Sequence, residues 1–283
     1  MSKKASLLII GLAAMLISLT ACAPAPTTSP PRQVSAQSSD IPAQQKPAPQ
    51  KWVPPQAEYD FPAKGVPFLY YHSIASLPGN VAGVPPAEFA AQMKYLYDAG
   101  FSAVSLDQFY AAYEGKEKLP RKPVVITFDD GYPDNYSIAF PILKQYNFTA
   151  AFFVVTGYME PGQGMLTWDQ LREMQAYGMT IGSHTVDHLE LSKLSLAEQK
   201  NEIFQSKAKI ESELGTSVDY FCYPNGKFNQ TTLSLLRQAG YKLAVTTAPG
   251  TAKRGDNPLL LKRVFVNGLN DLADFKRRVT QAG

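Results

Sequence analysis

The chain has 283 residues and a formal net charge of +3, and 45% of its residues are hydrophobic. A chain of this length is long enough to bury a sizeable core. A net charge this small creates no strong field for a polyanion, so the composition argues against a protein that binds nucleic acid.

Residues 1–21 have the pattern of an export signal. Lys3 and Lys4 form a positive start, and an apolar run too short to span a membrane comfortably follows at 7–19. The run ends in Leu-Thr-Ala-Cys, which resembles a bacterial lipobox and implies a lipid on Cys22. An ordinary cleaved signal peptide is the alternative. With Cys22 acylated, Cys222 has no partner within the chain, so we expect no structural disulfide.

The segment 22–58 is rich in Pro, Gln, Ser, Thr and Ala and has scarcely any large apolar side chain. Such a segment cannot bury enough surface to fold, so we expect a disordered and partly extended tether. A tether of this length would hold the folded part away from the membrane. The sequence therefore predicts a signal peptide at 1–21, a lipid-anchored tether at 22–58 and one folded domain at 59–283.

The folded domain alternates short apolar runs with amphipathic stretches. Three predicted helices end at Gly100, Gly178 and Gly240, because glycine adopts the left-handed conformation that stops a helix. Ser-Leu-Ala-Glu at 195–198 looks like a capping box that opens a helix running to Gly215. Strands are predicted at 68–71, 103–105, 124–128, 151–155, 180–182, 220–223, 243–246 and 263–266. This alternation predicts an α/β domain with a parallel sheet, closed or open.

Carboxylates and imidazoles follow two of these predicted strands. Asp129 and Asp130 end the run that begins at Val124, and His184 and His188 follow the strand at 180–182. Loops at the carboxyl ends of parallel strands are where chemistry gathers in such folds. An Asp-Gly turn and a solvated histidine pair are the alternatives. Together the two motifs supply three ligands for a divalent ion and a spare carboxylate as base, which indicates metal-assisted hydrolysis.

In this order and separation, Thr-Phe-Asp-Asp-Gly at 127–131 and Ser-His-Thr-Val-Asp-His at 183–188 resemble the motifs of the NodB-homology polysaccharide deacetylases, carbohydrate esterase family four. The resemblance implies a single catalytic domain folded as a distorted (β/α)7-type barrel. The strand count predicted above is compatible with such a barrel.

The same resemblance assigns roles to the four motif residues. It implies that Asp130, His184 and His188 bind the metal and that Asp129 is the general base. Two neutral imidazoles and one carboxylate suit zinc, with cobalt or nickel as replacements.

The third histidine, His72, departs from the common family pattern. Many members carry the acid histidine in a late Leu-x-x-His motif, but no histidine follows His188 here. Some lipoprotein deacetylases of exported poly-β-1,6-N-acetylglucosamine are rearranged so that an early Tyr-His motif takes this role, and Tyr71-His72 resembles it. This implies that His72 is the general acid. A strand-end histidine bonded to a backbone carbonyl is the alternative.

Residues 221–226 resemble the third family motif, commonly Arg-x-Pro-Tyr, whose arginine orients the base. Cys222 stands at the arginine position, and a thiol cannot replace a guanidinium fork. Either another residue, with Arg263 as the candidate, steadies Asp129, or activity is weakened. Asn225 stands at the tyrosine position, whose backbone N–H would face the oxyanion.

Trp168 and Tyr223 are weaker candidates for contact with a sugar ring, and core packing is the alternative for Trp168. We expect a hydrolase that removes N-acetyl groups from an extracellular or envelope polysaccharide, foremost poly-β-1,6-N-acetylglucosamine. Peptidoglycan, chitin and O-acetylated xylan are alternative substrates. Two non-catalytic alternatives also stay open. One is a lipoprotein that binds glycan without turnover, and the other is an envelope lipoprotein whose metal only stabilises the fold.

The anchor implies a place in the cell envelope. Ala23 follows Cys22 in place of the aspartate associated with inner-membrane retention. We therefore expect the outer membrane in a host with two membranes, and otherwise the outer face of the plasma membrane.

Replacing Cys22 with Ser should abolish acyl labelling and move the chain from the membrane fraction to the soluble fraction, because the tether has no other apolar segment. Cys222→Ser, at a position expected to be a buried and inert thiol, is the matched control and should leave fractionation unchanged. Membrane fractionation that is unchanged in Cys22→Ser would reject the lipobox interpretation.

Overall fold

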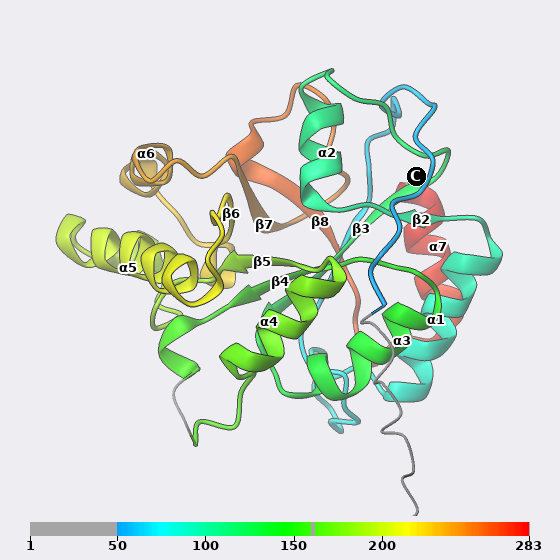
Figure 1. Cartoon of the computed structure of the whole chain (residues 1–283), viewed down its shortest axis with the longest axis horizontal. Helices are drawn as coiled ribbons and strands as arrows, with labels where there is room; N and C mark the ends of the chain where they lie inside the picture. The colour runs from blue at the N-terminus through cyan, green and yellow to red at the C-terminus, as the bar shows by residue number, and fades with distance from the viewer. Residues whose placement is uncertain (1–49, 160–161, 283) are drawn as a thin grey trace, which may run out of the picture. The chain divides into compact units, whose positions relative to one another are not determined.

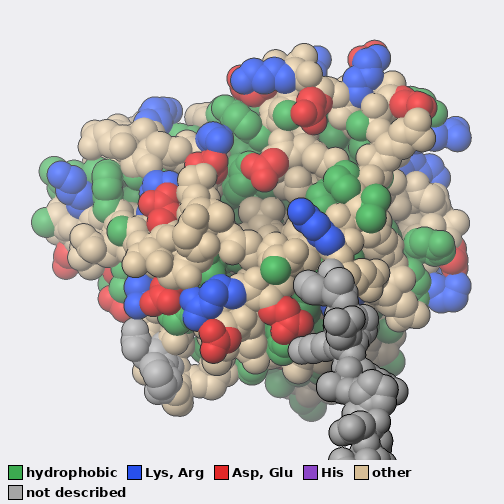
Figure 2. Space-filling view, viewed as in Figure 1, with side chains coloured by type: hydrophobic (Ala, Val, Ile, Leu, Met, Phe, Trp, Pro, Cys, Tyr) green, Lys and Arg blue, Asp and Glu red, His purple; other side chains and the backbone are tan. Residues whose placement is uncertain are grey.

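The structure is a computed structural model of the chain and describes residues 50–159 and 162–282. The predicted signal peptide, Cys22 and the predicted tether up to residue 49 lie outside the described residues. Among the described helices, none is long and apolar enough to cross a bilayer. On the face that Figure 2 shows, acidic and basic side chains of the described part are interspersed, as the small net charge suggests.

Seven parallel strands of the described residues close into a ring. Helices lie around the outside of the strands (Figure 1). In ring order the strands are β1 (Phe68–Tyr71), β3 (Pro123–Asp130), β4 (Ala151–Val154), β5 (Thr180–Ser183), β6 (Tyr220–Cys222), β7 (Leu243–Pro249) and β8 (Leu261–Phe265), which pairs with β1 again. The short β2 (Ser102–Ala103) pairs with the start of β3. The predicted (β/α)7-type barrel is confirmed, and every predicted strand is present with small shifts at its ends.

The helices follow the strands in the expected alternation. They are α1 (Pro86–Asp98), α2 (Leu106–Tyr113), α3 (Phe140–Gln145), α4 (Trp168–Tyr177), α5 (Leu196–Leu214), α6 (Gln230–Gln238) and α7 (Leu272–Ala282). The π-helical turn η1 (Asn135–Ala139) leads into α3. The predicted start and end of α5 are confirmed. The Ser195 side chain accepts the N–H of Glu198, and Gly215 adopts the left-handed conformation that ends the helix.

Alternate side chains of each strand face the two sides of the barrel wall. Val124, Ile126 and Phe128 of β3 belong to the apolar layer beneath the helices. Val125 belongs to a second cluster with Phe153, Cys222 and Leu261, which come from three other strands and fill the barrel interior. By the same alternation Asp129 faces the interior, so its carboxylate enters an enclosed environment. The strands are apolar on both sides because neither side meets water.

Residues 50–58 fall within the predicted tether, but Trp52 and Val53 among them contact the domain. The backbone N–H of Trp52 donates to the Tyr177 carbonyl at 2.6 Å. The Asn147 side chain bonds both the N–H and the carbonyl of Val53, at 3.0 and 2.7 Å. These contacts place the start of the packed chain ahead of the boundary predicted at Tyr59. Composition alone could not reveal them, because their partners are far away in the sequence.

Candidate active site

The predicted catalytic and metal-binding residues meet at one end of the barrel. Asp129 and Asp130 end β3, and His184 directly follows β5. Tyr71 of β1 pairs in register with Phe128 of β3, so His72, the next residue, lies level with Asp129. The strands are parallel, so their carboxyl ends share one mouth.

Asp130, His184 and His188 form a cluster whose ligating atoms lie within 4.8 Å of one another. The Nε2 atoms of His184 and His188 are 3.4 and 3.5 Å from Oδ1 of Asp130. This oxygen is buried and has no hydrogen-bond partner among the described residues. A buried carboxylate oxygen that faces two imidazole nitrogens fits a divalent cation, because the cation would satisfy all three atoms.

The tautomer of His184 suits a ligand. Its Nδ1 is 2.8 Å from the Cys222 carbonyl oxygen, which can only accept, so Nδ1 carries the proton and donates it. In the neutral form of His184 the lone pair of Nε2 is then directed toward Asp130. A metal-binding histidine is usually oriented in this way by a bond from its other nitrogen.

Burial and neighbouring charges set the protonation of the cluster. Burial opposes ionisation of Asp130, but His184 beside it lowers the pKa of the Asp130 carboxyl overall. Burial, together with the nearby His184, lowers the pKa of His188 and favours its neutral form. Burial also lowers the pKa of His184, but the neighbouring acidic groups, Asp130 and Asp129 among them, raise it by more, so the pKa stands above its ordinary value. A proton and a cation would therefore compete for His184.

The backbone of the cluster is strained. Asp130, Thr185 and His188 have φ angles of 76°, 71° and 56°, in the left-handed region that non-glycine residues rarely adopt. For Thr185 the branched side chain makes this conformation especially unfavourable. Such residues gather at functional sites where the surrounding structure holds them in place.

Asp129 forms a buried ion pair with Arg263 of β8. Nη1 and Nη2 of Arg263 donate to Oδ1 and Oδ2 of Asp129 at 2.8 and 2.7 Å, and Arg263 is 0% exposed. Nη2 also lies 3.3 Å from Sγ of Cys222. Burial opposes ionisation of Asp129, but the Arg263 guanidinium holds its pKa well below the usual range. Of the two alternatives for the missing motif arginine, the structure thus shows the one in which Arg263 contacts Asp129.

A second group of possible ligands, formed by Asp129, His184 and Cys222, does not suit a cation. The Arg263 guanidinium already touches both Asp129 and Cys222 and would repel a positive ion. Burial raises the pKa of the Cys222 thiol, so it stays protonated. The cluster around Asp130 is therefore the candidate metal site.

Residues 116–244 match a family model described as polysaccharide deacetylase. The chain is 40% identical over 206 residues to YxkH of Bacillus subtilis (strain 168), a protein provisionally named a polysaccharide deacetylase. The match covers 73% of this chain and 72% of that protein. The chain belongs to the polysaccharide deacetylase family. The NodB-homology resemblance is thereby confirmed, and this family supports a hydrolase that acts on polysaccharide.

Other relatives of this chain agree with the family assignment. The chain is 27% identical over 217 residues to a poly-beta-1,6-N-acetyl-D-glucosamine N-deacetylase of Staphylococcus aureus (strain MRSA252), over 71% of this chain and 73% of the relative. The solved structure of the Streptococcus pyogenes deacetylase PplD in complex with acetate superposes with a TM-score of 0.72 at 32% identity, over 76% and 98% of the two chains. The structure of IcaB from Ammonifex degensii superposes with a TM-score of 0.68 at 29% sequence identity, over 80% of this chain and 99% of that chain.

His72 of the deacetylase has a buried Nδ1 with no hydrogen-bond partner among the described residues. Its ring packs edge-on against Tyr70 and Phe265, with centroids 5.8 and 6.3 Å away. The alternative of a side chain bonded to a backbone carbonyl is therefore not what the structure shows. The general-acid role of His72 stays a prediction.

Two residues that the sequence interpretation missed hold the backbone at His72. Asp134 accepts a hydrogen bond from Oγ of Ser73 at 2.6 Å and from the N–H of Ile74 at 2.8 Å. Nδ2 of Asn135 donates to the His72 carbonyl at 2.8 Å. Both follow the Asp-Asp-Gly motif closely, but in the sequence they look like ordinary residues that open a helix.

The remaining candidates differ in position. Asn225 is exposed in the turn after β6, with φ 54°, and so lies at the end of the barrel that carries the mouth. Tyr223 is 0% exposed and its hydroxyl donates to the Leu259 carbonyl at 2.8 Å. Its ring packs against Phe221 and Phe228, so this structure leaves no exposed face of Tyr223 for the predicted sugar contact. Trp168 begins α4 and lies under Nζ of Lys209, 5.6 Å from the ring centroid, and its sugar contact stays a prediction.

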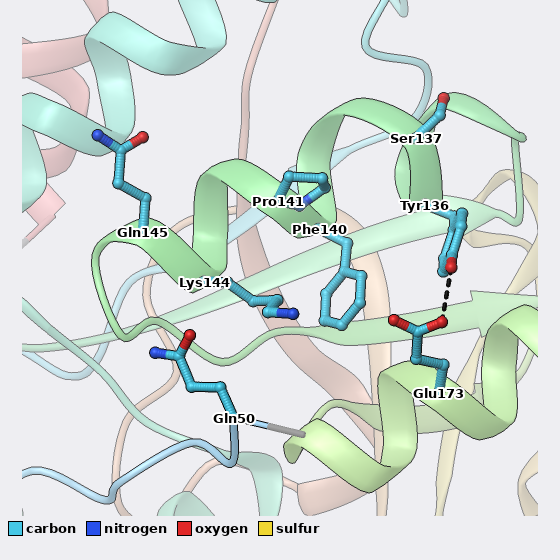
Figure 3. A pocket seen from close by; sticks show the side chains of 8 residues that line it. All are labelled: Gln50, Tyr136, Ser137, Phe140, Pro141, Lys144, Gln145 and Glu173. Atoms are coloured by element: carbon cyan, nitrogen blue, oxygen red, sulfur yellow. Dashed lines mark hydrogen bonds between the residues drawn. The ribbon is translucent and has the colours of Figure 1, made fainter. Parts of the chain in front are cut away.

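A groove on the barrel's outer side is separate from this site. It has a volume of about 590 Å³ and lies between the η1–α3 segment and α4, where Tyr136 donates to Glu173 at 2.7 Å (Figure 3). Lys144 and Phe140 also line it. It contains none of the predicted catalytic or metal-binding residues.

Arg263→Met should leave Asp129 buried and unpaired, so the free energy of unfolding at pH 7 should fall by about 3–5 kcal/mol. The folded-state pKa of Asp129 is depressed, so the stabilisation is present above the ordinary carboxyl pKa of about 3.9 and is lost as pH falls toward the folded value. Urea unfolding should therefore show a smaller difference between the variant and the native chain at pH 3 than at pH 7.

Arg254→Met is the matched control, since Arg254 is exposed and bonds one carbonyl, that of Ala112. It should change the free energy of unfolding by less than about 1 kcal/mol. A stability of Arg263→Met equal to that of this control would contradict the assigned importance of the ion pair.

Proposed function

We propose that the chain is a metal-dependent hydrolase that removes N-acetyl groups from an envelope polysaccharide, foremost poly-β-1,6-N-acetylglucosamine. The observation that carries the proposal is the placement of an ionised, buried carboxylate, Asp129, next to the three-ligand cluster of Asp130, His184 and His188. A site that only stabilised the fold would have no use for this spare carboxylate.

The ligand cluster suits a catalytic ion. Asp130, His184 and His188 would hold zinc, and cobalt or nickel fit the same donors. When bound there, the ion would act as a Lewis acid and make a water molecule easier to deprotonate. Three protein ligands leave coordination positions for water and substrate, which favours catalysis over a purely structural role.

The other residues have complementary tasks in amide hydrolysis. Asp129 accepts a proton from the attacking water, and Arg263 keeps the carboxylate ionised and correctly oriented. Each Asp129 oxygen retains a lone pair beyond its bond to Arg263. The backbone N–H of Asn225 donates to the developing oxyanion. His72 gives a proton to the leaving nitrogen, and the products are acetate and a free amine on the sugar.

Three features support poly-β-1,6-N-acetylglucosamine as the substrate. The Staphylococcus aureus relative is named for this polymer. His72 occupies the early position found in deacetylases of exported poly-N-acetylglucosamine. A lipid on Cys22 and the tether at 22–58 would place the domain in the cell envelope, at the outer membrane where the host has two, within reach of an exported chain.

The zinc-loaded chain should release acetate from N-acetylated β-1,6-glucosamine oligomers with a higher kcat/KM than from chitin oligomers, peptidoglycan fragments or acetylated xylan. Asp129→Asn should retain zinc and lose turnover by about a hundredfold or more, because it removes the base. Asp130→Asn should lose both zinc and turnover. Binding of the oligomers without acetate release would instead indicate a glycan-binding lipoprotein, and preference for another glycan would reject the proposed substrate.

His72→Ala should retain zinc and the fold but slow amide hydrolysis by about a hundredfold. Hydrolysis of an aryl acetate should slow much less, because an aryl oxide leaves without help from an acid. Turnover of both substrates, zinc content and circular dichroism together test this role. Equal losses on amide and ester would indicate positioning rather than proton donation, and unaffected amide turnover would exclude His72 from the reaction.

A further inference from the structure

Glu202, on α5, contacts the loop that carries two of the candidate ligands. Its side chain is almost fully buried, and Oε2 accepts the N–H groups of both Val186 and Asp187 at 2.9 Å. These two residues lie between His184 and His188. A single carboxylate oxygen therefore binds the middle of the loop from the side of the helix layer.

The loop needs such a constraint because its backbone is unfavourable on its own. Thr185 and His188 are both left-handed, and neither is glycine. Oγ1 of Thr185 accepts the N–H of His188 at 3.0 Å, which joins the two strained residues. Without Glu202, the N–H groups of Val186 and Asp187 would lose their partner, and the loop could relax to more common backbone angles.

The backbone of Glu202 is hydrogen-bonded to a residue that also contacts the loop. Oγ of Ser206, one turn later on α5, donates to the Glu202 carbonyl at 2.7 Å. The same Ser206 hydroxyl lies 2.7 Å from Oγ of Ser183, the residue directly before His184. Helix α5 therefore contacts the start of the loop through Ser206 and its middle through Glu202, so the helix and the loop are joined at two places.

We propose that Glu202 is a positioning residue that sets the metal affinity of the site by fixing the His184–His188 loop. The inference rests on the proposed metal site of Asp130, His184 and His188. Glu202 binds backbone N–H groups rather than the cation, so its effect passes through the placement of His188. Groups that orient metal ligands typically change affinity by about 10–100-fold when removed.

Cobalt binding to the full chain tests this positioning role. Glu202→Ala should weaken Co²⁺ binding by about 10–100-fold and alter the visible absorption spectrum of the bound ion, because the geometry of the ligands changes. Glu202→Gln should bind Co²⁺ within about threefold of the native chain, since one amide oxygen can accept both N–H groups. Competition with a chelator of known affinity gives the dissociation constants.

Glu211→Ala is the matched control. Glu211 lies on the same helix and also accepts a backbone N–H, that of Val218 at 3.0 Å, on the segment that leads into β6. It should lower the melting temperature of the metal-free chain about as much as Glu202→Ala does, but it should leave Co²⁺ affinity and the spectrum unchanged. This separates an effect on the site from a general loss of stability.

The outcomes distinguish this inference from the proposed metal site. A native chain that binds no Co²⁺ would reject the site itself. Native binding with an unchanged affinity and spectrum in Glu202→Ala would overturn the role of Glu202. If Glu202→Ala does not fold, Glu202→Asp takes its place, because it withdraws the carboxylate by one methylene group. Weaker binding in that variant supports the inference, and native affinity overturns it.

Discussion

The ion pair between Arg263 and Asp129 is the interaction on which the site depends. Both side chains point into the barrel and are almost fully buried, where an unpaired charge would be very costly. The two bonds between them join β8 to β3, on either side of β1. The same pair keeps Asp129 ionised, so one contact serves the packing of the barrel and the chemistry at its mouth.

A closed barrel explains how an arginine from β8 can take a place that the family motif gives to β6. Inward-facing residues of different strands converge on the barrel axis, so side chains distant in the sequence can reach the same point. Cys222 faces this interior and is much smaller than arginine, which leaves room for the Arg263 guanidinium. The guanidinium lies between Asp129 and Cys222 and excludes a cation from that side. The candidate metal site is thereby confined to Asp130 and the two histidines.

Candidate metal ligands at the mouth lie in segments with unfavourable backbone conformations. Hydrogen bonds from elements packed around the barrel stabilise these segments. Asp130 is left-handed at the end of β3, and the loop from His184 to His188 contains two more residues of this kind. Buried polar groups, foremost Glu202, bind the loop from the helix layer, while Asp134 and Asn135 bind the backbone around His72. The geometry of the candidate site is thus maintained by side chains outside the proposed ligands, base and acid.

Local patterns in the sequence were enough to predict the βα alternation, the capped ends of α5 and the two motifs that supply the candidate metal ligands. Strand alternation, a capping box and a glycine stop are properties of neighbouring residues, so they can be read without knowledge of the fold. The barrel itself and the role of His72 came from the family resemblance. The structure confirms the barrel and places His72 beside Asp129.

Tertiary structure decided the contacts that join distant parts of the chain. Arg263 and Asp129 are 134 residues apart, so the sequence offered Arg263 only as one candidate for this contact. In the sequence Glu202 looks like an ordinary surface charge, because charged residues are rarely buried unless they are paired. Tyr223 follows an inward-facing residue and therefore turns away from the interior, which the motif alone did not reveal. Trp52 packs on the domain although its segment has the composition of a tether. Such contacts leave no local periodicity, so only the folded chain shows them.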